Sequence, residues 1–143
     1  MSDDLPSIRR LEDDPTIRRL GGDPPSPYEA MFGFNRVVTA GPWVVISGTT
    51  SVDPSGFVVG TTPYEQTVAI LDKLIHELAR VGLSADDVVL TRMYVTDISR
   101  SDEVGRAHGE AFGAAGPAAT MVEVSALIDP RMLVEIELMA YRG

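Results

Sequence analysis

The last quarter of the chain constrains the fold most strongly, because its apolar residues follow the period of a β-strand. Val134, Ile136 and Leu138 alternate with Glu135 and Glu137. Successive side chains of a strand point to opposite faces, so this pattern predicts a strand with one buried face and one acidic face. The two carboxylates then lie roughly 6.5–7 Å apart on one side of the sheet. A solvated outer face is the simpler interpretation, whereas burial by a neighbouring subunit would suit them to general acid or base work.

The rest of the chain shows the periodicities of further strands and of two helices. A helix is expected from the N-cap Thr62 to Gly82, since proline follows the cap and the apolar residues recur at helical spacing. Its predicted inward stripe is Val68, Leu71, Leu74, Ile75 and Leu78. A second helix is expected over 101–113, and strands over 35–40, 43–49, 87–96, 120–127 and 132–141. This order predicts an α+β fold, a mixed sheet with both helices on one face.

The other face of such a sheet has no helix left to cover it. Met121, Leu133 and Met139 are apolar residues that we expect there. Glu123 and Ser125 are expected on the same surface as Met121. Because a large exposed apolar face is unusual in a monomer, we expect other copies of the chain to cover it.

The N-terminal part differs in organisation from the rest. Residues 6–14 are followed at once by a similar segment, residues 15–23. We therefore divide the chain into an N-terminal extension over 1–23 and a single domain over 24–143. The second copy can form a first edge strand, and the first copy is expected to be dispensable. Residues 23–27 contain three prolines and are expected to form a rigid, irregular linker.

Composition excludes several classes of function. The chain has 143 residues, no cysteine and a net charge of −9, with 21 acidic against 12 basic residues. The acidic balance disfavours nucleic acid as a partner.

The longest apolar stretches are far shorter than the ~20 residues that span a bilayer, and the N-terminus lacks a secretory signal, so we expect a cytoplasmic protein without a membrane partner. Neither His76 nor His108 has a partner at metal-ligand spacing, and no phosphate loop is found, so no metal or cofactor is expected.

Several short motifs, in a fixed order, give the chain a family resemblance. They are Ser47-Gly48-Thr49, Gln66-Thr67, Asp87-Val88-Val89, Tyr94-Val95-Thr96-Asp97, Pro117-Ala118 and Val134-Glu135-Ile136-Glu137. From about Gly33 to Ala140 the chain resembles the RidA/YjgF family, whose best-known members hydrolyse reactive enamines and imines. The resemblance implies a chorismate-mutase-like fold, a homotrimer and a small-molecule cleft at each subunit junction.

The resemblance also implies site residues, two of which depart from the family pattern. Glu137 matches the acid that family deaminases use on the attacking water, and Ser47-Gly48 matches backbone that lines the cleft. Phe34 stands where those enzymes have a tyrosine, and Ala119 replaces the arginine that holds the substrate carboxylate. Met121, on the strand that follows Ala119, is a further binding candidate. These departures predict little hydrolysis of amino-acid-derived imines.

Arg36 is a candidate replacement for the missing arginine. In an extended segment it points to the same side as Phe34, so it could meet an anionic ligand. The alternative is a surface arginine, or one paired with Glu29 or Glu137. Two functions stay open: a divergent hydrolase acting on a small imine or carbonyl compound, and a non-catalytic trimeric module that binds a small molecule or a protein. The charge disfavours a ribonuclease or translation-inhibitor role.

Overall fold

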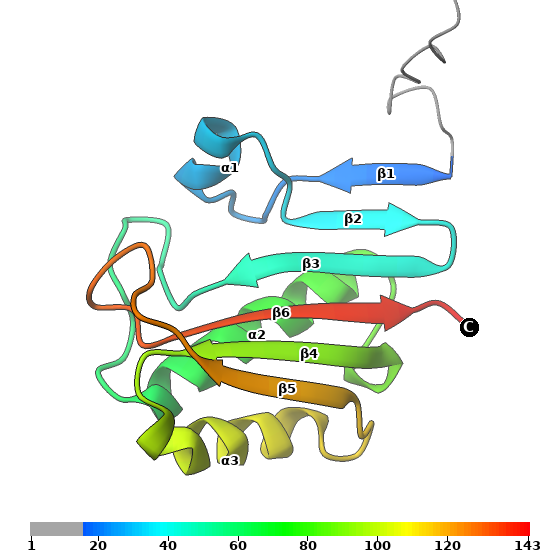
Figure 1. Cartoon of the computed structure of the whole chain (residues 1–143). Helices are drawn as coiled ribbons and strands as arrows, with labels where there is room; N and C mark the ends of the chain where they lie inside the picture. Colours follow the sequence, from blue (N-terminus) through cyan, green and yellow to red (C-terminus); the bar gives the residue numbers. More distant parts are fainter. Residues whose placement is uncertain (1–15) are drawn as a thin grey trace, which may run out of the picture.

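A six-stranded mixed sheet forms the framework of the molecule (Figure 1). The computed structural model describes residues 16–143. The strands are β1 (Ile17–Leu20), β2 (Val37–Ala40), β3 (Trp43–Thr49), β4 (Val88–Val95), β5 (Ala118–Glu123) and β6 (Val134–Tyr141), in the spatial order β1-β2-β3-β6-β4-β5. Only β4 and β5 are parallel, and the other neighbours are antiparallel. The predicted mixed sheet is confirmed, although β5 ends four residues earlier than expected.

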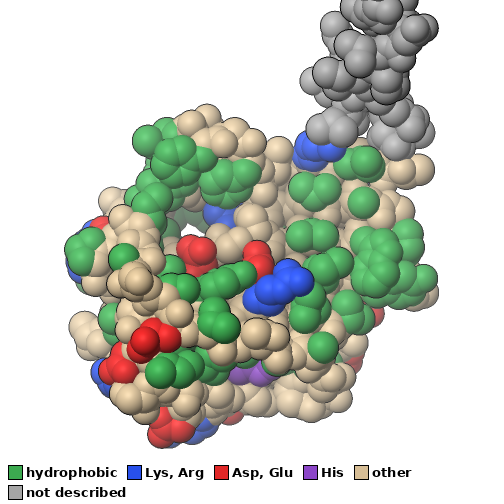
Figure 2. All heavy atoms as spheres, viewed as in Figure 1, with side chains coloured by type: hydrophobic (Ala, Val, Ile, Leu, Met, Phe, Trp, Pro, Cys, Tyr) green, Lys and Arg blue, Asp and Glu red, His purple; other side chains and the backbone are tan. Residues whose placement is uncertain are grey.

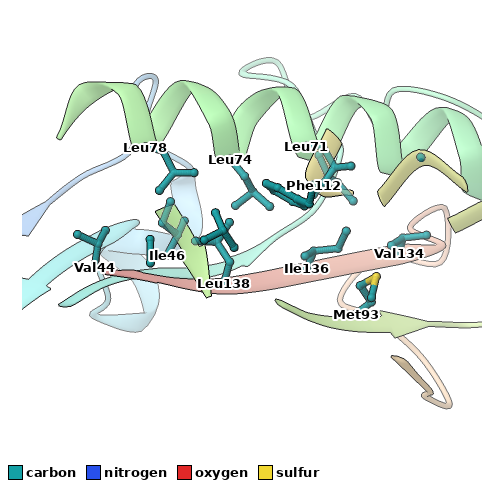
Figure 3. Packing of buried hydrophobic residues seen from close by; sticks show 14 of the residues in the cluster. Val44, Ile46, Leu71, Leu74, Leu78, Met93, Phe112, Val134, Ile136 and Leu138 are labelled. Atoms are coloured by element: carbon teal, nitrogen blue, oxygen red, sulfur yellow. The ribbon is translucent and has the colours of Figure 1, made fainter. Parts of the chain in front are cut away.

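Two long helices, α2 (Pro63–Arg80) and α3 (Ser101–Phe112), lie on one face of this sheet, as predicted (Figure 1). The Thr62 side chain caps α2 by accepting a hydrogen bond from the Glu65 N–H. The stripe of α2 faces the strands, with Leu71, Leu74 and Leu78 buried (Figure 3). Val68, expected in that stripe, is 36% exposed instead. Two short 3-10 helices, η3 (Ala85–Asp87) and η4 (Ile98–Arg100), flank β4.

The core fills the space between this helix pair and the sheet. β6 contributes every second residue, so the alternation that predicted the strand also builds the core. The fully buried members include Val44, Ile46, Ile70, Leu74, Leu78, Phe112, Val134 and Ile136. Burial of large apolar side chains is the main term stabilising such a layer.

A third helix, α1 (Pro27–Phe32), begins at the last residue of the expected linker and continues beyond it. The Ser26 side chain accepts from the Tyr28 N–H, and the Glu29 carboxylate accepts from the Ser26 N–H, so the two ends of a capping box are satisfied. Pro27 occupies the first helical position, where its missing N–H costs nothing. Residues 23–26 are irregular, as expected for the linker, and the helix that begins at Pro27 was not predicted.

The open face of the sheet differs in content from the expectation. Met121 and Leu133 pack against the core rather than on the open face. Glu123 pairs in register with the buried Val95 and accepts a hydrogen bond from the Ile98 N–H, so it also lies on the helix side. Met139 lies on the open face, as expected, and the apolar side chains beside it include Val45, Leu90 and Val122.

At the N-terminal side, β1 lies within the second copy of the duplicated segment and pairs with β2 as an edge strand. The first copy, residues 6–14, lies outside the described residues. Within residues 16–143, no helix combines the length and hydropathy that crossing a membrane requires.

Candidate functional site

A β-bulge marks the candidate site. Ile46 pairs with Leu138 and Thr49 with Ile136, so two residues of β3, Ser47 and Gly48, stand opposite one residue of β6. A bulge of this kind interrupts the ladder and leaves backbone groups of the bulged strand without their usual partners. Such irregularities re-aim neighbouring side chains and are frequent beside active sites.

Arg36 braces this bulge. Its Nη1 donates to the carbonyl oxygens of Gly48 at 2.7 Å and of Ser47 at 3.4 Å, and to the hydroxyls of Ser47 at 3.0 Å and Thr49 at 3.1 Å. The guanidinium also lies 5.6 Å from the centre of the Phe34 ring. Burial lowers the pKa of Arg36, although nearby carboxylates oppose the shift. Arg36 therefore replaces ladder partners at the bulge, while its Nε and Nη2 have no hydrogen bond within residues 16–143.

Gly48 allows the carboxylate of Glu135 to approach the bulge. A Cβ at this position would stand 2.7 Å from Glu135 Oε1, which is closer than real Cβ atoms come. Burial raises the pKa of Glu135, the negative charge of Glu137 raises it further, and Arg36 opposes both. Glu135 is thus a partly desolvated carboxylate that holds its proton to a higher pH than an ordinary glutamate.

A pocket of about 500 Å³ opens beside Glu135 and the bulge. Tyr28 and Phe32 of α1 form one side of it, and Ala126, Leu127 and Ile128 from the loop before β6 form the other. Figure 2 shows the surface hollowed between α1 and that loop. The lining also contains Phe34, Arg36, Ser47 and Gly48. The structure thus brings together four of the seven residues that the sequence singled out.

The other three candidates lie outside this pocket. Glu137 is on the open face, where its Oε1 accepts from the Tyr94 hydroxyl at 2.5 Å and from Arg92 at 3.5 Å. Ala119 is exposed on β5, and both β4 and β6 separate it from β3. Met121 packs against the core. Ala119 could therefore line such a pocket only in a second copy of the chain.

The sequence did not reveal the walls of the pocket. It indicated Glu135 and Glu137 together as candidate acids or bases, and the family resemblance then selected Glu137. One wall comes from α1. The signal that could have revealed this helix is the capping-box spacing of Ser26 and Glu29, with Pro27 at the first helical position. The described part of the chain contains no group of three or more His, Asp or Glu residues arranged to hold a metal ion.

Comparison with known proteins agrees with this architecture. Residues 25–142 match the family described as Endoribonuclease L-PSP. The chain is 39% identical over 118 residues to the uncharacterized protein SCO2049 of Streptomyces coelicolor, covering 82% of this chain and 88% of the relative. It is 32% identical over 111 residues to the RutC family protein PH0854 of Pyrococcus horikoshii, covering 76% and 86%.

Solved structures show the same fold. The crystal structure of Rv2704 from Mycobacterium tuberculosis, a member of the YjgF/YER057c/UK114 family, superposes with a TM-score of 0.78 at 42% identity. That superposition covers 87% of this chain and 98% of Rv2704. Yeast Mmf1 superposes with the same TM-score at 19% identity, covering 90% of this chain and all of Mmf1, a likeness of fold alone. The match over residues 25–142, together with these relatives, shows that the chain belongs to the RidA/YjgF family.

Proposed function

We propose that this protein is a RidA-like hydrolase that acts on a small imine or enamine in the pocket beside the Ser47–Gly48 bulge. Glu135, rather than Glu137, is the acid and base of this proposal. The observation that carries it is the position of Glu135: a partly buried carboxylate in the pocket lining, held against Gly48, with a raised pKa.

The reaction requires one group that both takes and returns a proton. Water adds to the imine carbon as the Glu135 carboxylate takes one of its protons. The carboxyl group returns this proton to the nitrogen, which gives a carbinolamine. The carboxylate then takes the hydroxyl proton and passes it to the amino nitrogen, so the C–N bond breaks as the C=O bond forms, and a carbonyl compound and ammonia leave. A carboxyl group whose pKa is raised towards the working pH suits both halves of this cycle.

Arg36 is the proposed contact for an anionic group on the substrate. Its Nη1 is held by the bulge, but Nε and Nη2 have no described partner, and the residue lines the pocket. Arginine binds carboxylates through such paired N–H donors. Ala119 offers only a methyl group, so wild-type turnover of carboxylated imines is expected to be slow.

A homotrimer is the proposed working form. Val45 and Val122 of the open face are 39% and 42% exposed, an apolar surface that association would bury. Association would also bring β5 of one copy, which carries Ala119, near the pocket of another.

The double change Ala119→Arg with Phe34→Tyr is therefore expected to raise turnover of carboxylated imines above that of the wild type.

The experiment is steady-state decay of small imines generated in solution, with and without a carboxylate. Wild type should exceed the uncatalysed rate, and Glu135→Gln should lower the catalysed rate by about 10²-fold or more, the usual scale for a lost acid or base. Glu137→Gln is the matched control on the same strand and should retain most of the rate.

Equal losses of rate in the two variants would contradict the choice of Glu135 over Glu137 as the acid and base. A wild type that binds carboxylates but never exceeds the uncatalysed rate would instead support a binding module. This second function is favoured by Ala119, which stands where the family resemblance implies the arginine that holds the substrate carboxylate.

A further inference from the structure

A second pocket, of about 410 Å³, lies on the helix side of the molecule. It is enclosed by the proline-rich segment 23–27, the loop after β3 and one face of α2. Its walls include Pro24, Pro54, Val59 and Ala69. This space adjoins the proposed hydrolase site, because Arg36 and Lys73 line both, but it does not contain Glu135.

Lys73, the only lysine of the chain, projects from α2 between the two pockets. Its Nζ donates to the backbone carbonyls of Thr50 at 2.6 Å and Val52 at 2.8 Å. Within residues 16–143, no carboxylate forms an ion pair with it. A neutral amine has two N–H groups for these two carbonyls, and its lone pair is then left for the remaining tetrahedral direction.

The surroundings of Lys73 increase the fraction of this neutral form. Burial, together with the nearby positive charge of Arg36, lowers the pKa of Lys73 to about 8, although Asp53 and Glu77 oppose the shift. Desolvation beside another cation is the usual way in which proteins activate a lysine amine as a nucleophile.

An unsatisfied hydroxyl stands in the same pocket. Ser51 is 2% exposed, and its Oγ is the one buried side-chain polar atom of residues 16–143 that has no hydrogen-bond partner. Leaving such a group unpaired costs about 1–3 kcal/mol, so a ligand oxygen that accepts from it would gain that bond. Ser51 lines the pocket close in sequence to both carbonyls that hold Lys73.

We propose that this pocket binds a small neutral aldehyde or ketone and that Lys73 condenses with it to form a Schiff base. The amine nitrogen bonds to the carbonyl carbon, and the carbonyl oxygen becomes the hydroxyl of a carbinolamine beside Ser51. Water leaves with that oxygen and two hydrogens, and the C=N bond forms. The lining carries more carboxylates than cations, which disfavours an anionic ligand: Asp23, Asp53, Asp72 and Glu77 against Arg36 and Lys73.

The test is reductive trapping with propanal and cyanoborohydride at pH 7.5, read by peptide mass spectrometry. The N-terminal amine is the other amine of the chain and serves as the internal standard. The ratio of Lys73 labelling to N-terminal labelling should be about tenfold or more higher in the folded protein than in guanidinium-unfolded chain, where a lysine pKa is about 10.4. A folded ratio equal to or below the unfolded one would show that the two carbonyls merely tether the amine.

Ser51→Ala tests the pocket without disturbing a hydrogen bond of the fold. It should lower the folded labelling ratio several-fold while leaving the melting temperature unchanged. An unchanged ratio would refute the part assigned to Ser51. Glu135→Gln should lower imine hydrolysis by about 10²-fold or more yet leave the Lys73 ratio intact, so failure of one proposal is distinguishable from failure of the other.

Discussion

The side chain of Gly48 is a single hydrogen atom, and this small size determines where the carboxylate of Glu135, the proposed acid, can lie. Gly48 does not have a positive φ angle, so a glycine is not required there for its backbone conformation. It is needed because the Glu135 carboxylate occupies the space where a Cβ would be. Arg36 then holds the carbonyl of the same glycine, so one bulge positions both a carboxylate and a guanidinium.

Gly48→Ala should therefore damage activity more than stability. The atom that a Cβ would meet belongs to the flexible end of Glu135, so the carboxylate can turn away at small energetic expense. We expect imine hydrolysis to fall at least tenfold, with a melting temperature within a few degrees of the wild type. Gly105→Ala, on the surface of α3 where a Cβ meets nothing, is the control for both measurements. A Gly48→Ala variant with full activity would contradict the placement of Glu135.

At the scale of elements, α1 is short and depends on a buried carboxylate. Glu29 is 7% exposed and accepts from the Gly22 N–H at 2.8 Å as well as from the Ser26 N–H. It thus joins the segment after β1 to the start of α1. Tyr28 and Phe32, which wall the hydrolase pocket, stack on one another on the same helix.

Glu29→Ala should release this helix. Two backbone N–H groups lose a charged acceptor, which predicts a loss of about 2–4 kcal/mol in the free energy of unfolding. Denaturant unfolding measures this loss. The control is Glu110→Ala, which removes an exposed glutamate of α3 that accepts a hydrogen bond from the Tyr64 hydroxyl, and this variant should lose about 1 kcal/mol or less. Equal losses in the two variants would show that α1 does not depend on Glu29.

These elements also show how far the sequence alone can predict the structure. The alternation in 134–140 and the spacing of Leu71, Leu74 and Leu78 are local, so β6 and α2 could be predicted. The bulge could not, because it depends on the register between two strands about ninety residues apart in the chain. The choice between Glu135 and Glu137 depends on the same register, since their spacing places both on one face.

For the whole molecule, the open sheet face predicts association. We expect light scattering at micromolar concentration to give three times the chain mass of 15.4 kDa. Val45→Asp places a charge on that apolar face and should dissociate the particle, whereas Val68→Asp, on the exposed side of α2, should not. A monomeric wild type would contradict this expectation and would leave the open face uncovered.

The pH dependence of imine hydrolysis tests the central claim most directly, because it reports the ionisation of the group that moves the proton. The carboxylate form of Glu135 begins the reaction, so kcat/KM, corrected for the uncatalysed rate, should fall as pH drops through its pKa. That pKa should lie above the ordinary glutamate value of about 4.3, and Glu137→Gln should lower it by removing a neighbouring negative charge. Glu123→Gln, on the helix side of the sheet, should leave it unchanged. A midpoint that is the same in wild type and Glu137→Gln, or a profile without this limb, would contradict the assignment of Glu135.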